Sequence, residues 1–255
     1  MELLCFTGAK GGVGTSFAVA CLSAMLSRIE KKCVAVDLHG GMRTLDLYMG
    51  TDGDFVFDLH DVLSGNCSFG DAVVKSACGA DFVSCSQTKE FGQSDYDSMY
   101  KLLCDNCSEY DYVLLDYPRS FTDTELLAGC SKVAVVTNCD KASVRCTEKL
   151  VTALPAAANK FLIINNIVPE LISNGYNINV DDICDLCGVP PLGLIPYEPE
   201  AVVWDNAHSL LQNDSLTITQ AFANVAQRLE NNHVCAVSFD YRTPYYKYLK
   251  KISRR

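Results

Sequence analysis

The amino-acid sequence predicts a doubly wound α/β fold, in which a mostly parallel sheet is flanked by helices. Short apolar segments alternate with longer segments of helical spacing, and the apolar segments are hydrophobic at consecutive positions. Strands of that kind are buried on both faces, as in a parallel sheet covered by helices. The chain has 255 residues, of which 49% are hydrophobic, and it contains no linker rich in Pro, Gly or Ser. We therefore expect one domain, residues 1–240, followed by a tail, residues 241–255.

Seven apolar segments are the expected strands, and most intervals between them have helical spacing. The strands are expected at residues 2–8, 32–38, 80–86, 110–117, 132–138, 160–166 and 192–197. The clearest helical patterns cover residues 15–32 and 143–160. Because ligands of such sheets bind at the carboxyl ends of the strands, binding residues are expected in the loops that follow them.

The loop after the first strand, "TGAKGGVGTSFAVA", has the glycine pattern of a phosphate-binding loop. Gly11, Gly12 and Gly14 allow backbone N–H groups to surround an anion, and the following helix adds its dipole. Ser16 supplies a hydroxyl for Mg²⁺. Thr15 stands where such loops normally carry a lysine. A glycine-rich turn that binds nothing is the alternative interpretation.

Two acidic residues end buried strands. Asp37 closes "VAVD" and Asp116 closes "YVLLD". A carboxylate at this edge of the sheet suits a Mg²⁺ ion held through water. Each residue alone is also typical of a turn or a helix cap. The glycine loop and both carboxylates together favour a nucleotide site over either alternative.

On these motifs the sequence resembles the MinD/ParA family of deviant Walker A P-loop ATPases, whose loop reads KGGxGK[TS]. Lys10 occupies the position of the family's signature lysine. The resemblance extends from residue 1 to about residue 230, and it includes the switch I segment "VAVDLHGGMRTLDLYMG" and the Walker B strand "YDYVLLDYP". The text "MRTLDLYMG" is similar to the MinD branch, with the pilus-positioning CpaE and TadZ proteins as a neighbouring branch.

The resemblance implies an ATP-dependent homodimer in which Lys10 reaches the partner's phosphates. ATP and Mg²⁺ are the implied cofactors, and Lys10, Asp37 and His39 occupy the catalytic positions. The implied nucleotide-binding positions are Lys10, Gly11, Gly12, Val13, Gly14, Thr15, Ser16, Asp116, Asn165, Pro196 and Glu198. The implied metal ligands are Ser16, Asp37 and Asp116.

The sequence departs from the family's pattern at three positions. Thr15 removes the loop lysine, His39 replaces the second Asp of the switch I motif Asp-x-Asp, and Ser120 replaces a glycine after the Walker B strand. Phosphoryl transfer depends on positioned charge, so these changes predict that ATP binding is kept and hydrolysis is slow. His39 either orients water in place of the missing Asp or is a solvated loop histidine.

Two functions follow from the resemblance. One is a slow ATPase switch that positions the division site, a pilus or a flagellum from the inner face of the membrane, together with an unidentified protein regulator. The other is a nucleotide-bound scaffold that does not hydrolyse ATP. DNA partitioning in the ParA manner is the weakest alternative, because the net charge of −10 repels DNA phosphates.

The C-terminal tail of the sequence is strongly basic. The last eleven residues, "YYKYLKKISRR", carry five basic groups and no acid, which predicts either a membrane-surface anchor or a frayed basic end. The chain lacks an export signal and a membrane-spanning run, so we expect a cytoplasmic, membrane-peripheral protein.

The pairs Cys104–Cys107 and Cys184–Cys187 could form a metal site only if they met in space, and most cysteines are expected to be buried hydrophobes.

Overall fold

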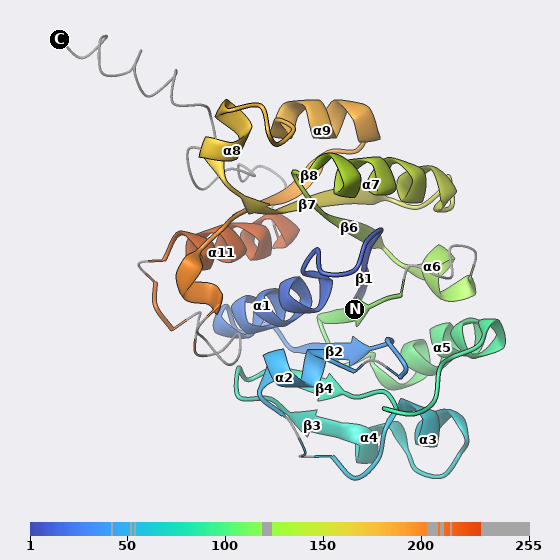
Figure 1. The fold of residues 1–255 in the computed structure, drawn as a ribbon. Coiled ribbons are helices and arrows are strands. Elements are labelled where there is room, and N and C mark those ends of the chain that lie inside the picture. Colours follow the sequence, from blue (N-terminus) through green and yellow to red (C-terminus); the bar gives the residue numbers. More distant parts are fainter. Residues whose placement is uncertain are drawn as a thin grey trace.

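The computed structural model describes residues 1–230, except residues 42, 52, 54, 119–123, 203–208, 210, 211 and 215. Eight strands form one sheet in the order β3-β4-β2-β5-β1-β6-β7-β8 (Figure 1). The strands are β1 Glu2–Gly8, β2 Cys33–Asp37, β3 Val73–Lys75, β4 Asp81–Val83, β5 Tyr112–Asp116, β6 Lys132–Asn138, β7 Lys160–Ile167 and β8 Pro191–Pro196. All neighbouring strands are parallel except β3 and β4. The predicted fold class is therefore confirmed.

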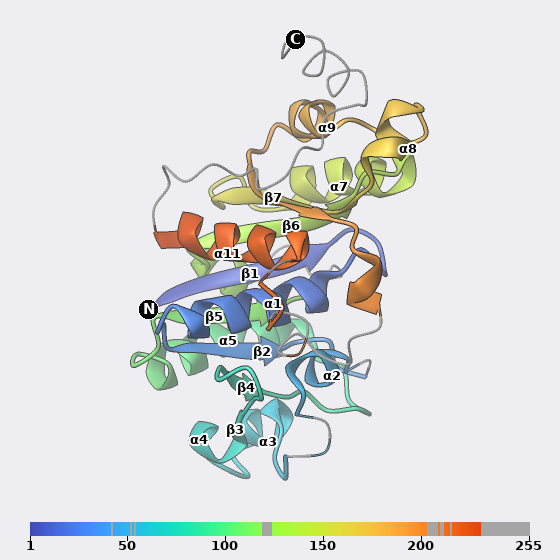
Figure 2. The same cartoon turned by 90° about the vertical axis from the view of Figure 1, so that its left-hand side faces the viewer.

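Helices cover both faces of the sheet (Figures 1 and 2). Their bounds are α1 Thr15–Arg28, α2 Leu45–Met49, α3 Leu59–Leu63, α4 Phe69–Ala72, α5 Gln93–Asn106, α6 Glu125–Gly129, α7 Lys141–Ala153, α8 Pro169–Ser173, α9 Val180–Cys187, the 3₁₀ helix η1 Pro199–Val202 and α11 Thr217–Glu230. Buried side chains of α1, α2 and α11 form the core on one face, and those of α5, α6, α7 and α9 form the core on the other. The strands between are buried on both faces, as their consecutive apolar residues predict.

Sequence periodicity located the seven expected strands and missed β3. This strand has three residues, Val73 to Lys75, and pairs antiparallel with β4 at the edge of the sheet. Val73 and Val74 are only partly buried and Lys75 is exposed. Because an edge strand this short lacks the long apolar run of a central strand, the pattern does not distinguish it from a loop.

Two helices are shorter than the sequence pattern predicts. The expected helix at residues 15–32 ends at Arg28, and Glu30 has a left-handed φ of 62°. The expected helix at residues 143–160 begins earlier, at Lys141, with Asp140 as its N-cap, and ends at Ala153. Pro155 explains the second end, since proline disfavours helical conformation in the residue before it.

The two CxxC pairs lie far apart in the fold. Cys107 caps the end of α5 and packs into the core, whereas Cys184 and Cys187 lie on α9, at the opposite end of the sheet (Figures 1 and 2). The two pairs do not come together to form the joint site considered for them. Within the described part of the chain, no helix is long and apolar enough to cross a membrane. The predicted basic tail, residues 241–255, lies outside the described residues.

Candidate nucleotide-binding site

The glycine loop joins β1 to α1 at the carboxyl edge of the sheet. β1 lies between β5 and β6, so the loop is near the middle of that edge. Gly14 caps α1 in a left-handed conformation, with φ 94°, and a Cβ there would lie 2.3 Å from Nδ2 of Asn165. Glycine is required here by the backbone conformation and by this close approach.

Asn165, near the end of β7, holds the glycine loop through a hydrogen bond. Asn165 is 4% exposed, and its Nδ2 donates a 2.8 Å hydrogen bond to the carbonyl oxygen of Val13. Val13 is itself buried, so this bond satisfies a backbone acceptor that water does not reach. The asparagine at the end of β7 therefore holds the shape of the glycine loop.

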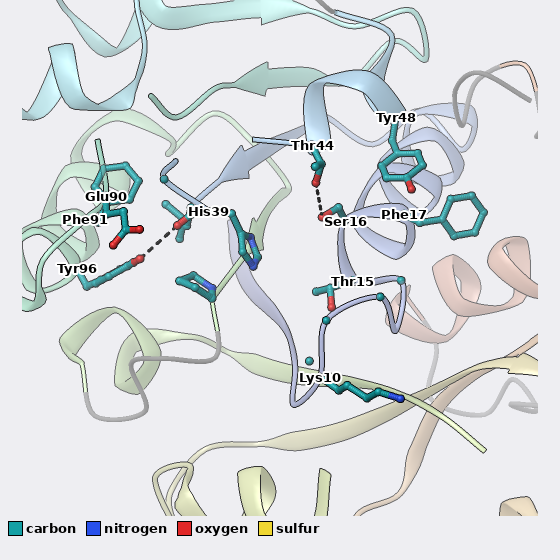
Figure 3. A pocket seen from close by; sticks show the side chains of 17 residues that line it. Lys10, Thr15, Ser16, Phe17, His39, Thr44, Tyr48, Glu90, Phe91 and Tyr96 are labelled. Atoms are coloured by element: carbon teal, nitrogen blue, oxygen red, sulfur yellow. Dashed lines mark hydrogen bonds between the residues drawn. The ribbon is translucent and has the colours of Figure 1, made fainter. Parts of the chain in front are cut away.

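An open cavity of about 530 Å³ lies against the loop (Figure 3). The predicted site residues that line it are Lys10, Gly11, Gly12, Gly14, Thr15, Ser16 and His39. Further lining side chains that sequence reasoning did not identify are Phe17, Thr44, Tyr48, Glu90, Phe91 and Tyr96. The hydroxyls of Ser16 and Thr44 are 3.3 Å apart, which connects the start of α1 to the residue before α2.

Some of these additional cavity residues could have been identified from the sequence. Thr44 and Tyr48 are four residues apart in "MRTLDLYMG", which places them on one side of a helical turn, and Phe17 directly follows Ser16. Glu90 and Phe91 have no such signal. They reach the cavity because the loop after β4 packs against Gly40, whose Cβ would meet the carbonyl oxygen of Lys89 at 2.5 Å.

Asp37 and Asp116 lie side by side on adjacent strands. They are register partners of the parallel pair β2 and β5, and both are fully buried. Asp37 accepts hydrogen bonds from the backbone N–H groups of His39 at 2.8 Å and Leu45 at 3.4 Å. Both carboxylate oxygens of Asp116 are buried without a hydrogen-bond partner. Such an arrangement is costly unless a cation or a bound group compensates it.

His39 lies beside both carboxylates. Its Nδ1 is 3.5 Å from Oδ1 of Asp116 and 3.9 Å from Oδ1 of Asp37, contacts of ion-pair length that do not have hydrogen-bond geometry. Burial lowers the pKa of His39, but the nearby Asp116 and Asp37 outweigh burial and raise it overall. Burial, followed by the charge of Asp116, raises the pKa of Asp37. His39 is therefore a partner of the acidic pair, and its side chain is 31% exposed, so it is partly buried against the two carboxylates rather than fully solvated.

Lys10 points away from the other loop residues. Its side chain is exposed and extends away from Ser16 and His39 (Figure 3). The ammonium lies 3.6 Å from Oδ1 of Asp140, and Asp140 in turn caps α7 through Ser143. In this structure the signature lysine is paired within its own chain.

The remaining predicted residues have more varied surroundings. Thr15, at the position where a lysine was expected, is the first residue of α1, is half-buried and lines the cavity. Pro196 ends β8 and is buried, and Glu198 follows it, half-buried. The predicted site residues that are not among the described residues lining the cavity are Val13, Asp37, Asp116, Asn165, Pro196 and Glu198. Ser120 lies outside the described residues.

The site fits a nucleotide and its cation. The loop offers backbone N–H groups and a helix N-terminus to phosphate, and Ser16 offers a hydroxyl beside them. The unpartnered oxygens of Asp116 are hard ligands of the kind that Mg²⁺ prefers. A parallel α/β sheet with a glycine loop after its central strand β1 and paired carboxylates on adjacent strands defines the class of P-loop nucleotide-binding proteins.

Comparisons with known proteins narrow this class. The family model described as "Cellulose biosynthesis protein BcsQ" matches residues 1–173. The septum site-determining protein MinD of Helicobacter pylori is 27% identical, over 96% of this chain and 97% of the relative. The chain belongs to the MinD/ParA family of P-loop ATPases, the wider group that also contains BcsQ. The predicted family is therefore confirmed.

Solved structures agree with this assignment. The MinC:MinD cell division protein complex of Aquifex aeolicus matches with a TM-score of 0.80 and 26% identity, covering 90% of this chain and 96% of that one. MinD of Pyrococcus horikoshii complexed with Mg-ADP matches with a TM-score of 0.75, covering 91% of this chain and 96% of that one. At 21% identity, the second match supports the fold alone.

Proposed function

We propose that this chain is a MinD-like, ATP-dependent switch that dimerises, acts in spatial positioning at the inner face of the membrane, and hydrolyses ATP slowly. One observation carries the proposal. The buried acidic pair, Asp37 and Asp116, has two unpartnered carboxylate oxygens at the same edge of the sheet as an intact glycine loop. A nucleotide accompanied by a divalent cation satisfies both features at once.

The loop residues have distinct roles in this proposal. Lys10 crosses to the partner's phosphates in the dimer, and the backbone from Gly11 to Thr15 surrounds the phosphates of its own subunit. Ser16 contacts Mg²⁺, with the buried acidic pair holding the ion's water ligands. Asn165, Pro196 and Glu198 remain the proposed base-binding positions. Asn165 would act there while it also holds Val13, a hydrogen bond that uses one of its two amide hydrogens.

Slow hydrolysis follows from two side chains. Thr15 provides no positive charge for the β and γ phosphates. His39, which stands where the family has an aspartate, contacts Asp116 and Asp37 in place of a water molecule that an aspartate would orient. Catalysis of phosphoryl transfer depends on these positioned charges, so their loss slows turnover more than it weakens binding.

The relatives suggest the biological setting. The Helicobacter relative is a septum site-determining protein, and the Aquifex relative forms a complex with MinC. A division-site role with a protein regulator is therefore the preferred setting, and pilus or flagellum placement is the alternative. The basic tail of residues 245–255 would supply contact with anionic lipid. The acidic body makes DNA an unfavourable partner.

A scaffold without turnover is the second candidate, and the contact of His39 with both carboxylates favours it. Calorimetric titration with ATP and Mg²⁺, followed by single-turnover phosphate release, separates the two. If the chain is a switch, it should bind ATP and release phosphate slowly, and Asp116→Asn should abolish the phosphate release. ATP binding without release would favour the scaffold, whereas absence of ATP binding would contradict both.

A further inference from the structure

The cluster of Asp37, His39 and Asp116 has the composition of a direct metal site. One ligand atom from each side chain can be chosen so that all three lie within 4.8 Å of one another. Two carboxylates and one imidazole are the donors of many transition-metal sites, whereas Mg²⁺ sites are built from oxygen donors. In the described part of the chain, no other group of this kind was found.

The separations between these atoms are close to those around one shared ion. Two ligand atoms that each lie about 2.1 Å from a tetrahedral ion are roughly 3.4 Å apart. Nδ1 of His39 lies 3.5 Å from the Asp116 oxygen and 3.9 Å from the Asp37 oxygen. The ligand atoms of Asp37 and Asp116 lie within 4.8 Å of each other, so binding one ion draws the three side chains closer together.

Several buried polar atoms of the cluster also lack a hydrogen-bond partner, and a bound metal ion would provide one. Both oxygens of Asp116 and Nδ1 of His39 are buried and lack hydrogen-bond partners. Asp37, by contrast, is fixed by two backbone N–H groups, one of them from His39. One carboxylate is therefore held in place by the backbone, while the Asp116 oxygens and Nδ1 of His39 have no hydrogen bond that a metal ion would have to break.

We propose that Asp37, His39 and Asp116 bind a divalent transition-metal ion directly, without nucleotide, and prefer it to Mg²⁺. The imidazole provides the preference, since nitrogen ligands favour zinc or cobalt over magnesium. The ion replaces the ion pair between His39 and the two carboxylates. It leaves at least one coordination position for water, because the cluster offers three protein atoms, and of the three residues only His39 lines the cavity.

Titration with Co²⁺, monitored by visible absorption in the presence of a reductant and without nucleotide, tests this site. We expect one equivalent of Co²⁺ to bind, to be displaced by Zn²⁺, and to resist a large excess of Mg²⁺. His39→Asn and Asp116→Asn should each weaken Co²⁺ binding about tenfold or more. His39→Asp should reduce the preference for Co²⁺ over Mg²⁺, because it restores an all-oxygen set of ligands.

His60→Asn is the matched control. Nδ1 of His60 lies 3.8 Å from Oδ1 of Asp58, but among the described residues these two belong to no group of three possible metal ligands, and Nδ1 already accepts a hydrogen bond from the Ser86 N–H. Its Co²⁺ affinity should equal that of the unaltered chain. Thermal unfolding of each variant checks that it folds.

Three results would overturn the proposal. They are the absence of stoichiometric binding, equal binding by the folded His39→Asn variant, and thiolate-to-cobalt charge transfer, which would place the ion on some of the fourteen cysteines. ATP binding measured on the same samples is an independent readout. If the protein binds ATP but not Co²⁺, the metal site is wrong and the proposed function stands. If it binds Co²⁺ but not ATP, the metal site stands and the proposed function is wrong.

Discussion

The ammonium of Lys10 lies 3.6 Å from the carboxylate of Asp140 in the same chain. Asp140 also caps α7, accepting hydrogen bonds from the backbone N–H and the hydroxyl of Ser143. Partial burial raises the pKa of Asp140, but the hydrogen bonds from Ser143, followed by the charge of Lys10, lower it overall. If Lys10 crosses to a partner's phosphates, it must first leave this acceptor.

Asp140→Asn should therefore favour dimerisation in the presence of ATP. Asparagine keeps the helix cap but removes the negative charge that holds Lys10. Both side chains of the pair are more than a third exposed, so the gain is at most about fivefold in the dimer dissociation constant. Sedimentation velocity with ATP and Mg²⁺ measures it. If this variant dimerises more weakly, Asp140 makes a favourable contact in the dimer and does not hold Lys10 back from it.

Asn165→Ala should loosen the glycine loop. The carbonyl of buried Val13 loses its hydrogen bond, which lowers the free energy of unfolding by about 1–3 kcal/mol. A loop-positioning role weakens binding of ATP and inorganic tripolyphosphate alike, whereas a role in base binding alone weakens only ATP. Calorimetric titration with both ligands distinguishes these roles.

Asn166→Gly is the control for that experiment, since Asn166 is exposed, its left-handed φ of 52° suits glycine, and the hydrogen bond of its amide is to Asn138. Unchanged tripolyphosphate affinity in Asn165→Ala would count against the positioning role that the structure indicates.

Thr15→Lys should tighten ATP binding about 10- to 150-fold. A charge-assisted hydrogen bond to the phosphates contributes roughly 1.5–3 kcal/mol, and it acts on the ground state and the transition state together. Hydrolysis should recover poorly in this variant, because His39 still occupies the position of the water-orienting aspartate.

The double variant Thr15→Lys, His39→Asp should exceed the sum of the single effects on turnover. Steady-state phosphate release from the four proteins, combined with ATP titration, gives the coupling. If the unaltered chain already turns over at the rate of the double variant, then Thr15 and His39 are not the residues that limit hydrolysis.

Removal of residues 245–255 should release the protein from anionic liposomes and leave nucleotide binding intact. These residues carry the five basic groups that attract anionic lipid, and added salt should weaken the attachment of the full chain by screening. Liposome cosedimentation measures it, with neutral liposomes as the control. Equal cosedimentation of the truncated and full chains would place the membrane contact elsewhere.

The sequence predicted the central sheet and the loop well because both depend on local patterns. Seven apolar runs located seven strands, and the glycine spacing between β1 and α1 located the loop. It also predicted that Asp37 and Asp116 end their strands. Their exact pairing across β2 and β5 depends on strand order, which one chain's periodicity does not determine.

The sequence pattern did not predict the contacts between segments that are far apart in the chain. The ion pair of Lys10 with Asp140 and the support of Val13 by Asn165 each join residues more than a hundred positions apart. Glu90 and Phe91 reach the cavity through the packing of a loop against Gly40. Such relationships arise from tertiary packing, so only the three-dimensional arrangement reveals that Asn165 supports the loop and that His39 contacts both carboxylates.

The central claim is that ATP binding brings two copies of this chain together through Lys10. Sedimentation velocity of the unaltered chain and of Lys10→Ala, each with Mg²⁺ and either ATP or ADP, tests it most directly. We predict a dimer only for the unaltered chain with ATP, because Lys10 reaches the partner's phosphates only across the interface and Thr15 leaves the loop without a second lysine. Equal association with ATP and ADP, or an ATP-dependent dimer that persists in Lys10→Ala, would contradict the account.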